Sequence, residues 1–152
     1  MINRPKIMIS VLIFNAEGTK ILIGKKYDEG SWGTISGKLD YGEGFEDCAA
    51  RILCNTANIL LEDQERVKFM CTYNVVDKSS NTHLVAVDYY LQLTKEEEKV
   101  HMMLDPYYYQ NWNWYSFEEV LKMYDNLFCG LKVFLKKFNI KSLEDIRSLD
   151  SN

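Results

Sequence analysis

One amphipathic helical pattern, set among runs of strand-like sequence, most constrains the fold of this chain. From Phe45 to about Ala57, apolar residues recur at three- and four-residue steps, the period of a helix with one buried face. The acidic residues Glu43, Glu46 and Asp47 stand near its start, where the helix dipole favours negative charge. This spacing predicts a helix over the whole segment.

The segments on both sides of this helix have the composition of β-strands. A hairpin is predicted near the N-terminus, because turn residues at 15–18 separate two runs of Ile, Val, Met and Leu. A second, antiparallel pair is predicted on either side of the polar stretch at residues 77–81. The predicted strands cover residues 6–14, 21–23, 32–35, 67–76, 83–94 and 112–115.

The sequence pattern in the last third of the chain predicts helices. Ser116 and Glu119 have the spacing of a capping box that opens a helix at Phe117. Apolar residues then continue at helical spacing to a break at Asn139. Ser142 is predicted to cap a short final helix that ends near residue 149.

Residues 95–111 have the sequence of an exposed excursion from the sheet, with a charged run at its start and the break Asp105–Pro106 inside it. Aromatic residues are frequent in residues 107–115. No basic residue is interleaved between Pro106 and Glu119, so a dimer interface or the packing of the last strand explains this run better than a stacking surface for nucleobases.

The order of these elements predicts an α+β domain with a mixed or mainly antiparallel sheet, because strands and helices do not alternate as in a parallel βαβ chain. With 152 residues, the chain has the size of one domain. We expect a single domain over residues 1–152, with a core at about 5–140 and the short C-terminal helix at 142–149.

The overall composition excludes several classes of protein. A net charge of -4 gives no general attraction to a phosphate backbone, which makes nucleic acid an unfavourable partner. The four cysteines are scattered and there are two histidines, which suggests neither a zinc cage nor a disulfide framework. We predict no signal peptide and no membrane span, and a reducing, cytoplasmic location.

Residues 36–59 form a Gly-rich loop that runs into the predicted helix, and here the sequence becomes specific. The segment resembles the box of the Nudix (MutT-like) hydrolase family, G-x5-E-x7-R-E-U-x-E-E-x-G-U, where U is aliphatic. The positions that match are Gly37, Glu43, Arg51, Leu53 and Ile59. The resemblance gives Gly37, Glu43 and Arg51 a structural role in this loop and helix.

Segments outside the box extend the resemblance over most of residues 5–140. Residues 31–44, 112–114 and 127–131 are similar to segments of the Nudix 15 type nucleoside triphosphate diphosphatases. The resemblance implies a Nudix fold, in which the box helix and the C-terminal helices sandwich the sheet. It also implies a pyrophosphohydrolase that uses Mg²⁺ or Mn²⁺ on nucleoside diphosphate or triphosphate derivatives, and a homodimer.

The departures from the box fall on the family's metal-binding glutamates. Ile52, Asn55 and Thr56 occupy these positions, and Asn58 replaces the later glycine. Magnesium prefers carboxylate oxygens, whereas amide and hydroxyl oxygens bring no net charge to a dication. We therefore predict no metal site and a pseudoenzyme, a catalytically impaired relative that binds a nucleotide, another small phosphorylated ligand or a protein partner.

Two other functions stay open. An active hydrolase could use a relocated metal site built from Glu43, Glu46 and Asp47, with Mg²⁺ or Mn²⁺. The simpler interpretation of these carboxylates is that they complement the start of the helix, with Glu43 paired to Arg51. An RNA-binding Nudix domain is the least favoured function, because the chain is acidic and has no patch that combines basic and aromatic residues.

Six residues are candidates for ligand contacts. We expect three lysines on loops near the phosphates, where they could bind an anion without a metal, although a solvated surface is an equal alternative. Three further residues match the segment that contacts the base in the similar subgroup, although their helical spacing is also typical of a core. The candidates are Lys25, Lys26 and Lys38, and Phe128, Gly130 and Leu131.

Overall fold

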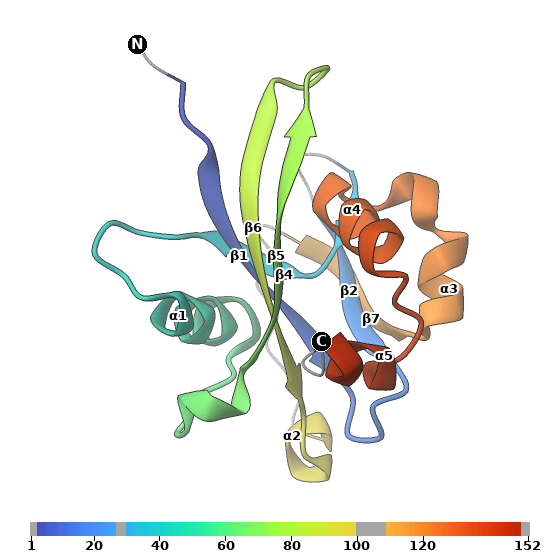
Figure 1. Ribbon diagram of the computed structural model, residues 1–152. Coiled ribbons are helices and arrows are strands. Elements are labelled where there is room, and N and C mark those ends of the chain that lie inside the picture. The colour runs from blue at the N-terminus through green and yellow to red at the C-terminus, as the bar shows by residue number, and fades with distance from the viewer. Residues whose placement is uncertain (1–2, 27–29, 100–108, 150–152) are drawn as a thin grey trace.

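A mixed seven-stranded sheet forms the middle layer of the protein, and helices cover both of its faces (Figure 1). This computed structural model describes residues 3–26, 30–99 and 109–149. The strands are β1 (Lys6–Phe14), β2 (Ile21–Lys26), β3 (Trp32–Gly33), β4 (Ile35–Lys38), β5 (Lys68–Asp77), β6 (Thr82–Gln92) and β7 (Tyr109–Tyr115). The helices are α1 (Phe45–Ala57), η1 (Gln64–Arg66), α2 (Lys95–Lys99), α3 (Phe117–Lys122), η2 (Tyr124–Asn126), α4 (Cys129–Phe138) and α5 (Leu143–Ser148).

The long strand β1 organises the sheet. It pairs in parallel with β6 and in antiparallel orientation with β2 and β4, while β5 pairs antiparallel with β6. A parallel pair needs a crossover, and the segment that contains α1 supplies it between β4 and β5. The predicted α+β fold with a mixed sheet and the predicted antiparallel pairing of the two long strands are both confirmed.

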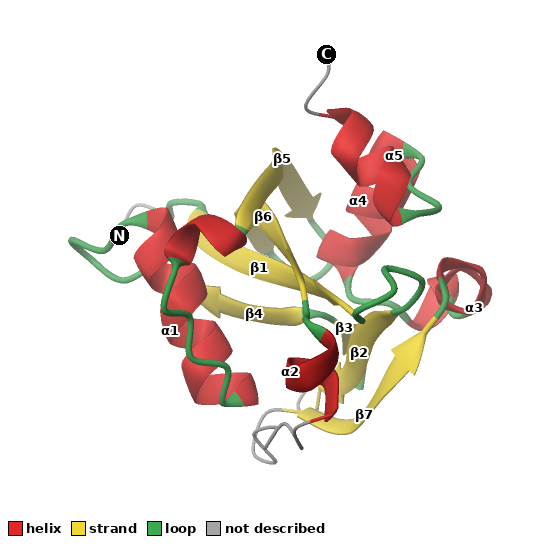
Figure 2. Ribbon diagram, turned by 90° about the horizontal axis from the view of Figure 1, so that it is seen from below, coloured by secondary structure: helices red, strands yellow, loops and turns green. Residues whose placement is uncertain are grey.

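Alternate residues of β1 point into two separate cores, as the period of a strand requires. Ile9, Val11 and Ile13 belong to the core beneath α1. Leu12 and Phe14 belong to the core beneath the C-terminal helices. Figure 2 shows α1 on one side of the sheet and α3, α4 and α5 on the other, so the predicted sandwich of helices around the sheet is confirmed.

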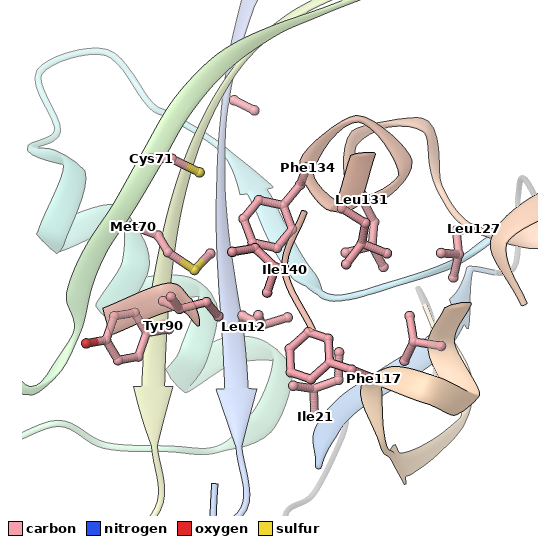
Figure 3. Packing of buried hydrophobic residues seen from close by; sticks show 14 of the residues in the cluster. Leu12, Ile21, Met70, Cys71, Tyr90, Phe117, Leu127, Leu131, Phe134 and Ile140 are labelled. Atoms are coloured by element: carbon pink, nitrogen blue, oxygen red, sulfur yellow. The ribbon is translucent and has the colours of Figure 1, made fainter. Parts of the chain in front are cut away.

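The core beneath the C-terminal helices is rich in large side chains. Leu131 and Phe134 of α4 pack toward Leu12 of β1 and Met70 of β5 (Figure 3). Full burial of a side chain such as Phe134, which is 1% exposed, contributes about 1.5–3 kcal/mol to stability. This packing holds α4 against the sheet.

Several predicted helix boundaries are confirmed. Helix α1 covers the predicted residues and ends at Asn58, which has the left-handed conformation (φ 53°) that Gly or Asn adopts with least strain. Ser116 and Glu119 form the predicted capping box. The Ser142 side chain accepts a hydrogen bond from the backbone of Asp145 at the start of α5.

The prediction of one continuous helical region from Phe117 to Asn139 was wrong. The chain forms α3, η2 and α4, with a break before Cys129. At this break Leu127 forms a bridge with Trp32, and the N–H of Phe128 donates to the Trp32 carbonyl at 2.7 Å. A contact with a residue far away in sequence therefore interrupts a pattern that is locally helical.

The strands also differ from the predictions at their ends. Residues 32–38 form two strands, and β2 continues to Lys26 instead of ending at residue 23. Strand β7 begins at Tyr109, so the predicted excursion ends earlier than expected, and its residues 100–108 lie outside the described part of the chain. Among the described helices, none has the length and apolar character needed to cross a membrane.

Packing of the last strand accounts for the described side chains of the aromatic run. Trp112 and Trp114 pack against the core beneath α1, and Tyr115 packs against the other core. An added Cβ on Gly24 would lie 2.6 Å from the Trp112 ring, so β2 needs glycine where this ring covers it. Residues 107 and 108 of the run lie outside the described part of the chain.

Candidate ligand-binding site

Glu43 and Arg51 clamp the loop between β4 and α1. The Arg51 guanidinium donates to both carboxylate oxygens of Glu43, at 2.7 and 3.0 Å, and to the Lys38 carbonyl at 2.9 Å. Glu43 also accepts from the backbone N–H of Asp40 at 3.1 Å. The Arg51 hydrogen bonds lower the pKa of Glu43 to about 2. The ion pair predicted from the sequence is present and fixes the shape of the loop.

The three residues that the resemblance aligns with metal-binding glutamates, Ile52, Asn55 and Thr56, do not have the chemistry of magnesium ligands. Ile52 is buried in the core, with 4% of its surface exposed, and its Cγ2 atom faces Gly37. Asn55 is exposed and Thr56 is half-buried, and both offer only neutral oxygens. Because magnesium is held mainly by carboxylates and phosphates, this set of side chains does not fit the ion.

The three acidic candidates for a relocated metal site each have separate contacts. Glu43 precedes α1 and is held by Arg51, so it does not share a helical face with Asp47. Glu46 accepts from the Tyr89 hydroxyl at 3.3 Å, and Asp47 accepts from Gln64 at 3.4 Å. In the described residues, no three His, Cys, Asp or Glu side chains gather as a metal-binding group.

A large basic groove lies at the end of the sheet near the N-terminus and the β5–β6 turn. Its volume is about 830 Å³, and four cationic side chains line it. Among the described residues that line it, one carries a carboxylate, Asp77, which already accepts hydrogen bonds from Ser79 and Ser80. The described part of the lining therefore carries more positive than negative charge. Its cations are Arg4, Lys6, Lys26 and Lys38.

The structure brings two of the three predicted lysines together. Lys26 and Lys38 line the groove, and the Lys26 ammonium lies 3.7 Å from the centre of the Phe128 ring. Lys25 is not part of the lining, and its Cε lies 4.0 Å from where a Cβ on Gly30 would be. The expected placement on loops was wrong, because all three lysines lie at the ends of strands β2 and β4.

A small cavity beneath α4 adjoins this groove. Its volume is about 20 Å³, and Phe128, Gly130 and Leu131 all line it. Met8, Leu84 and Phe128 line both the cavity and the groove, so the two spaces meet at these residues. The three residues predicted to contact a base are thus gathered at one place, beside the cationic groove.

Asp88 is a buried carboxylate in the wall of this cavity, with 6% of its surface exposed. The Tyr73 hydroxyl donates to its Oδ2 atom at 2.7 Å and lies 3.0 Å from the Gly130 carbonyl. Burial raises the pKa of Asp88 to about 7, although the Tyr73 hydrogen bond acts in the opposite direction. The same burial raises the pKa of Tyr73 above its ordinary value.

Four residues near the groove and the cavity were not predicted from the sequence: Arg4, Lys6, Tyr73 and Asp88. Arg4 precedes the first predicted strand and Lys6 is its first residue, and basic residues are common at such exposed ends and carry no local signal. Asp88 does have a local signal in the sequence, because it is the only charged residue within the β-rich run from residue 84 to 94. A carboxylate inside such a run indicates either an edge of the sheet or a polar site in the core.

Comparison with known proteins gives a consistent result. The model of the NUDIX domain matches residues 4–136. Similar solved structures include a MutT protein from Methanosarcina mazei Go1 (18% identity, 91% of this chain and 96% of that one, TM-score 0.71) and a MutT NUDIX hydrolase from Burkholderia pseudomallei (22%, 77% and 87%, 0.65). The NUDIX domain of Shewanella oneidensis NrtR, complexed with ADP ribose, is also similar (15%, 91% and 91%, 0.64).

Proposed function

Because the chain belongs to the NUDIX domain family, we propose that it binds a nucleotide, or another small phosphorylated ligand, and does not hydrolyse it by the family's magnesium-dependent route. The observation that carries this proposal is the identity of three residues, Ile52, Asn55 and Thr56, at the positions of the metal-binding glutamates. The Ile52 side chain is buried in the core, and the side chains of Asn55 and Thr56 carry no charge. A bound phosphate chain would have no carboxylate-held metal beside it on α1.

The basic groove supports binding without a metal. Four cations, of which Arg4, Lys6 and Lys38 are exposed, can offset the charge of a diphosphate or triphosphate. Phe128 lies between this groove and the small cavity, and its ring offers an apolar surface to a base. The groove adjoins the core beneath the C-terminal helices, whereas Ile52 belongs to the core on the other side of the sheet.

One structural neighbour binds a ligand of the proposed class. The NUDIX domain of NrtR was crystallised with ADP ribose, a nucleoside diphosphate derivative. At 15% identity the neighbour shows the fold alone, so the choice of ligand depends on the groove of this chain. We propose a nucleoside diphosphate or triphosphate derivative on this basis.

Calorimetric titration with ADP, ATP and ADP-ribose in the presence of EDTA tests the proposal. Binding should occur without a metal, and incubation with Mg²⁺ or Mn²⁺ should release no product at ordinary enzyme rates. Turnover at such rates would contradict the proposed lack of hydrolysis. Loss of binding in EDTA would contradict the metal-free site.

Three substitutions locate the phosphates. Lys26→Met and Lys38→Met should each weaken nucleotide binding about 5- to 10-fold, because each removes a cation from the groove. Lys25→Met is the matched control, since it removes the same charge from the same strand outside the groove. Equal effects of all three substitutions would show that only net charge matters and would exclude this groove.

Three finer predictions from the sequence remain proposals: similarity to the Nudix 15 type, a homodimer, and a cytoplasmic location. Sedimentation equilibrium would test the homodimer directly. The active hydrolase with a relocated metal site also stays a prediction, which Glu43→Ala and Asp47→Ala would test on any activity that is found.

A further inference from the structure

A row of polar side chains crosses the middle of a sheet face that is otherwise apolar. Ser36 of β4 pairs with Ser10 of β1, and Ser10 pairs with Asp88 of β6. These three side chains line the small cavity beneath α4, together with the apolar Leu12 and Phe134. A buried carboxylate costs free energy unless its oxygens accept hydrogen bonds, so Asp88 needs a polar partner inside the cavity.

The protein itself satisfies this carboxylate only in part. Among the described residues, none donates a hydrogen bond to the Oδ1 atom of Asp88. The Oδ2 atom depends on the hydroxyl of Tyr73, which also lies within 3.0 Å of the Gly130 carbonyl. A phenol has one proton to donate, so these two acceptors compete for it. Asp88 is therefore an acceptor with spare capacity, nine-tenths buried and part of a cavity wall.

The cavity lies next to the cationic groove. Met8, Leu84 and Phe128 line both spaces, so these three residues lie at the boundary between the groove and the cavity that Asp88 lines. A volume of about 20 Å³ holds about one water molecule or one group of similar size, and is too small for a whole ring. A ligand can therefore place an amino group in the cavity while its ring lies at the mouth, beside Phe128.

We propose that Asp88 determines base specificity in this protein, by accepting a hydrogen bond from the exocyclic amino group of adenine, guanine or cytosine. This inference rests on the proposed nucleotide binding and deepens it. An amino group donates a hydrogen bond to the free carboxylate oxygen of Asp88. The carbonyl oxygen of hypoxanthine or uracil is itself an acceptor, so it would be repelled by the carboxylate oxygen. Phosphates in the groove and an amino-bearing base edge at the cavity would then hold the two ends of one ligand.

Paired nucleotides that differ in the amino group test the proposal. Calorimetric titration in EDTA at pH 8, above the raised pKa of Asp88 of about 7, should show tighter binding of ATP than ITP, or of CTP than UTP, by about 10-fold, the effect of one hydrogen bond to a charged acceptor. This comparison needs no variant. Binding of both members of both pairs with equal affinity would overturn the role of Asp88 while leaving nucleotide binding intact. Binding of no nucleotide would overturn both proposals.

The substitution Asp88→Asn assigns the preference to this residue. It conserves shape and can still accept from Tyr73, but it presents an N–H group where the free carboxylate oxygen stood. The preference for the amino-bearing base should fall below about threefold or reverse. Asp125→Asn, on the exposed surface of η2, is the matched control and should keep the full preference. An Asp88→Asn variant that keeps the wild-type preference would overturn the proposal.

Discussion

The Cγ2 atom of Ile52 lies 2.6 Å from the position that a Cβ atom on Gly37 would occupy. Helix α1 and strand β4 therefore approach so closely that glycine is needed at residue 37. The contact is apolar, and residue 52 corresponds to a glutamate in the box that this segment resembles. Packing between these two elements therefore takes up the residue that the resemblance aligns with a metal ligand.

This contact predicts a coupling between two substitutions. Gly37→Ala should cost about 1–3 kcal/mol of unfolding free energy, because the new methyl group overpacks against Ile52. In an Ile52→Ala background the additional cost should fall below about 0.5 kcal/mol, which urea unfolding of the four proteins would measure. Gly33→Ala is the control, because its new Cβ would lie 3.4 Å from the Cβ of Phe128 and would not contact Ile52. An unchanged cost in both backgrounds would show that another contact requires glycine.

A second prediction concerns the restoration of the family's carboxylates. Asn55→Glu and Thr56→Glu together should change stability by less than about 0.5 kcal/mol, since neither side chain is buried. Ile52→Glu should cost about 2–4 kcal/mol because it places a charge in the core. If these are the positions of a lost site, Mg²⁺ should raise the melting temperature of the double variant and leave the wild type unchanged. An equal Mg²⁺ response of both proteins would contradict this assignment.

The ion pair of Glu43 and Arg51 predicts a loss of stability in acid. The pKa of Glu43 is lowered from 4.5 to about 2 in the folded protein, so the unfolded chain binds more protons between these values. The stabilisation is complete above about pH 4.5 and is lost as the pH falls toward 2. Glu43→Gln should remove this part of the acid dependence, so its urea midpoint should converge with that of the wild type near pH 2. A constant difference from pH 7 to pH 2 would contradict the assignment.

Elements set by local interactions were predicted well. Helix α1 has the expected bounds because its apolar period and its acidic start lie within one segment. The capping box at Ser116 and the N-cap at Ser142 depend on hydrogen bonds over three residues, and both are present. In these cases the sequence window that carries the signal contains all of the interacting groups.

Features that depend on distant contacts could not be predicted from one sequence. The break before α4 exists because Phe128 bonds to Trp32, almost a hundred residues earlier in the chain. The row of Ser36, Ser10 and Asp88 follows from the parallel register of β1 and β6, which no local pattern specifies. The groove likewise combines the N-terminal segment with the ends of β2 and β4.

Asp88 predicts a stability profile opposite in sign to that of Glu43. Burial raises its pKa from 3.8 to about 7, so the folded protein holds a proton between these values that the unfolded chain has released. Stability from this group is complete below about pH 4 and decreases as the pH rises to about 7. Tyr73 and Cys71 of β5 are the titratable neighbours, and they stay neutral over this range because burial raises their pKa values.

Asp88→Asn removes this titration and should therefore stabilise the protein at alkaline pH. Near pH 4 the variant and the wild type should melt at similar temperatures, because both carry a neutral side chain at this position. At pH 8 the variant should be more stable by about 1–3 kcal/mol, a rise of roughly 2–12 °C. Calorimetric melting of both proteins at pH 4, 6 and 8 would measure the difference. A difference that does not grow with pH would contradict the raised pKa of Asp88.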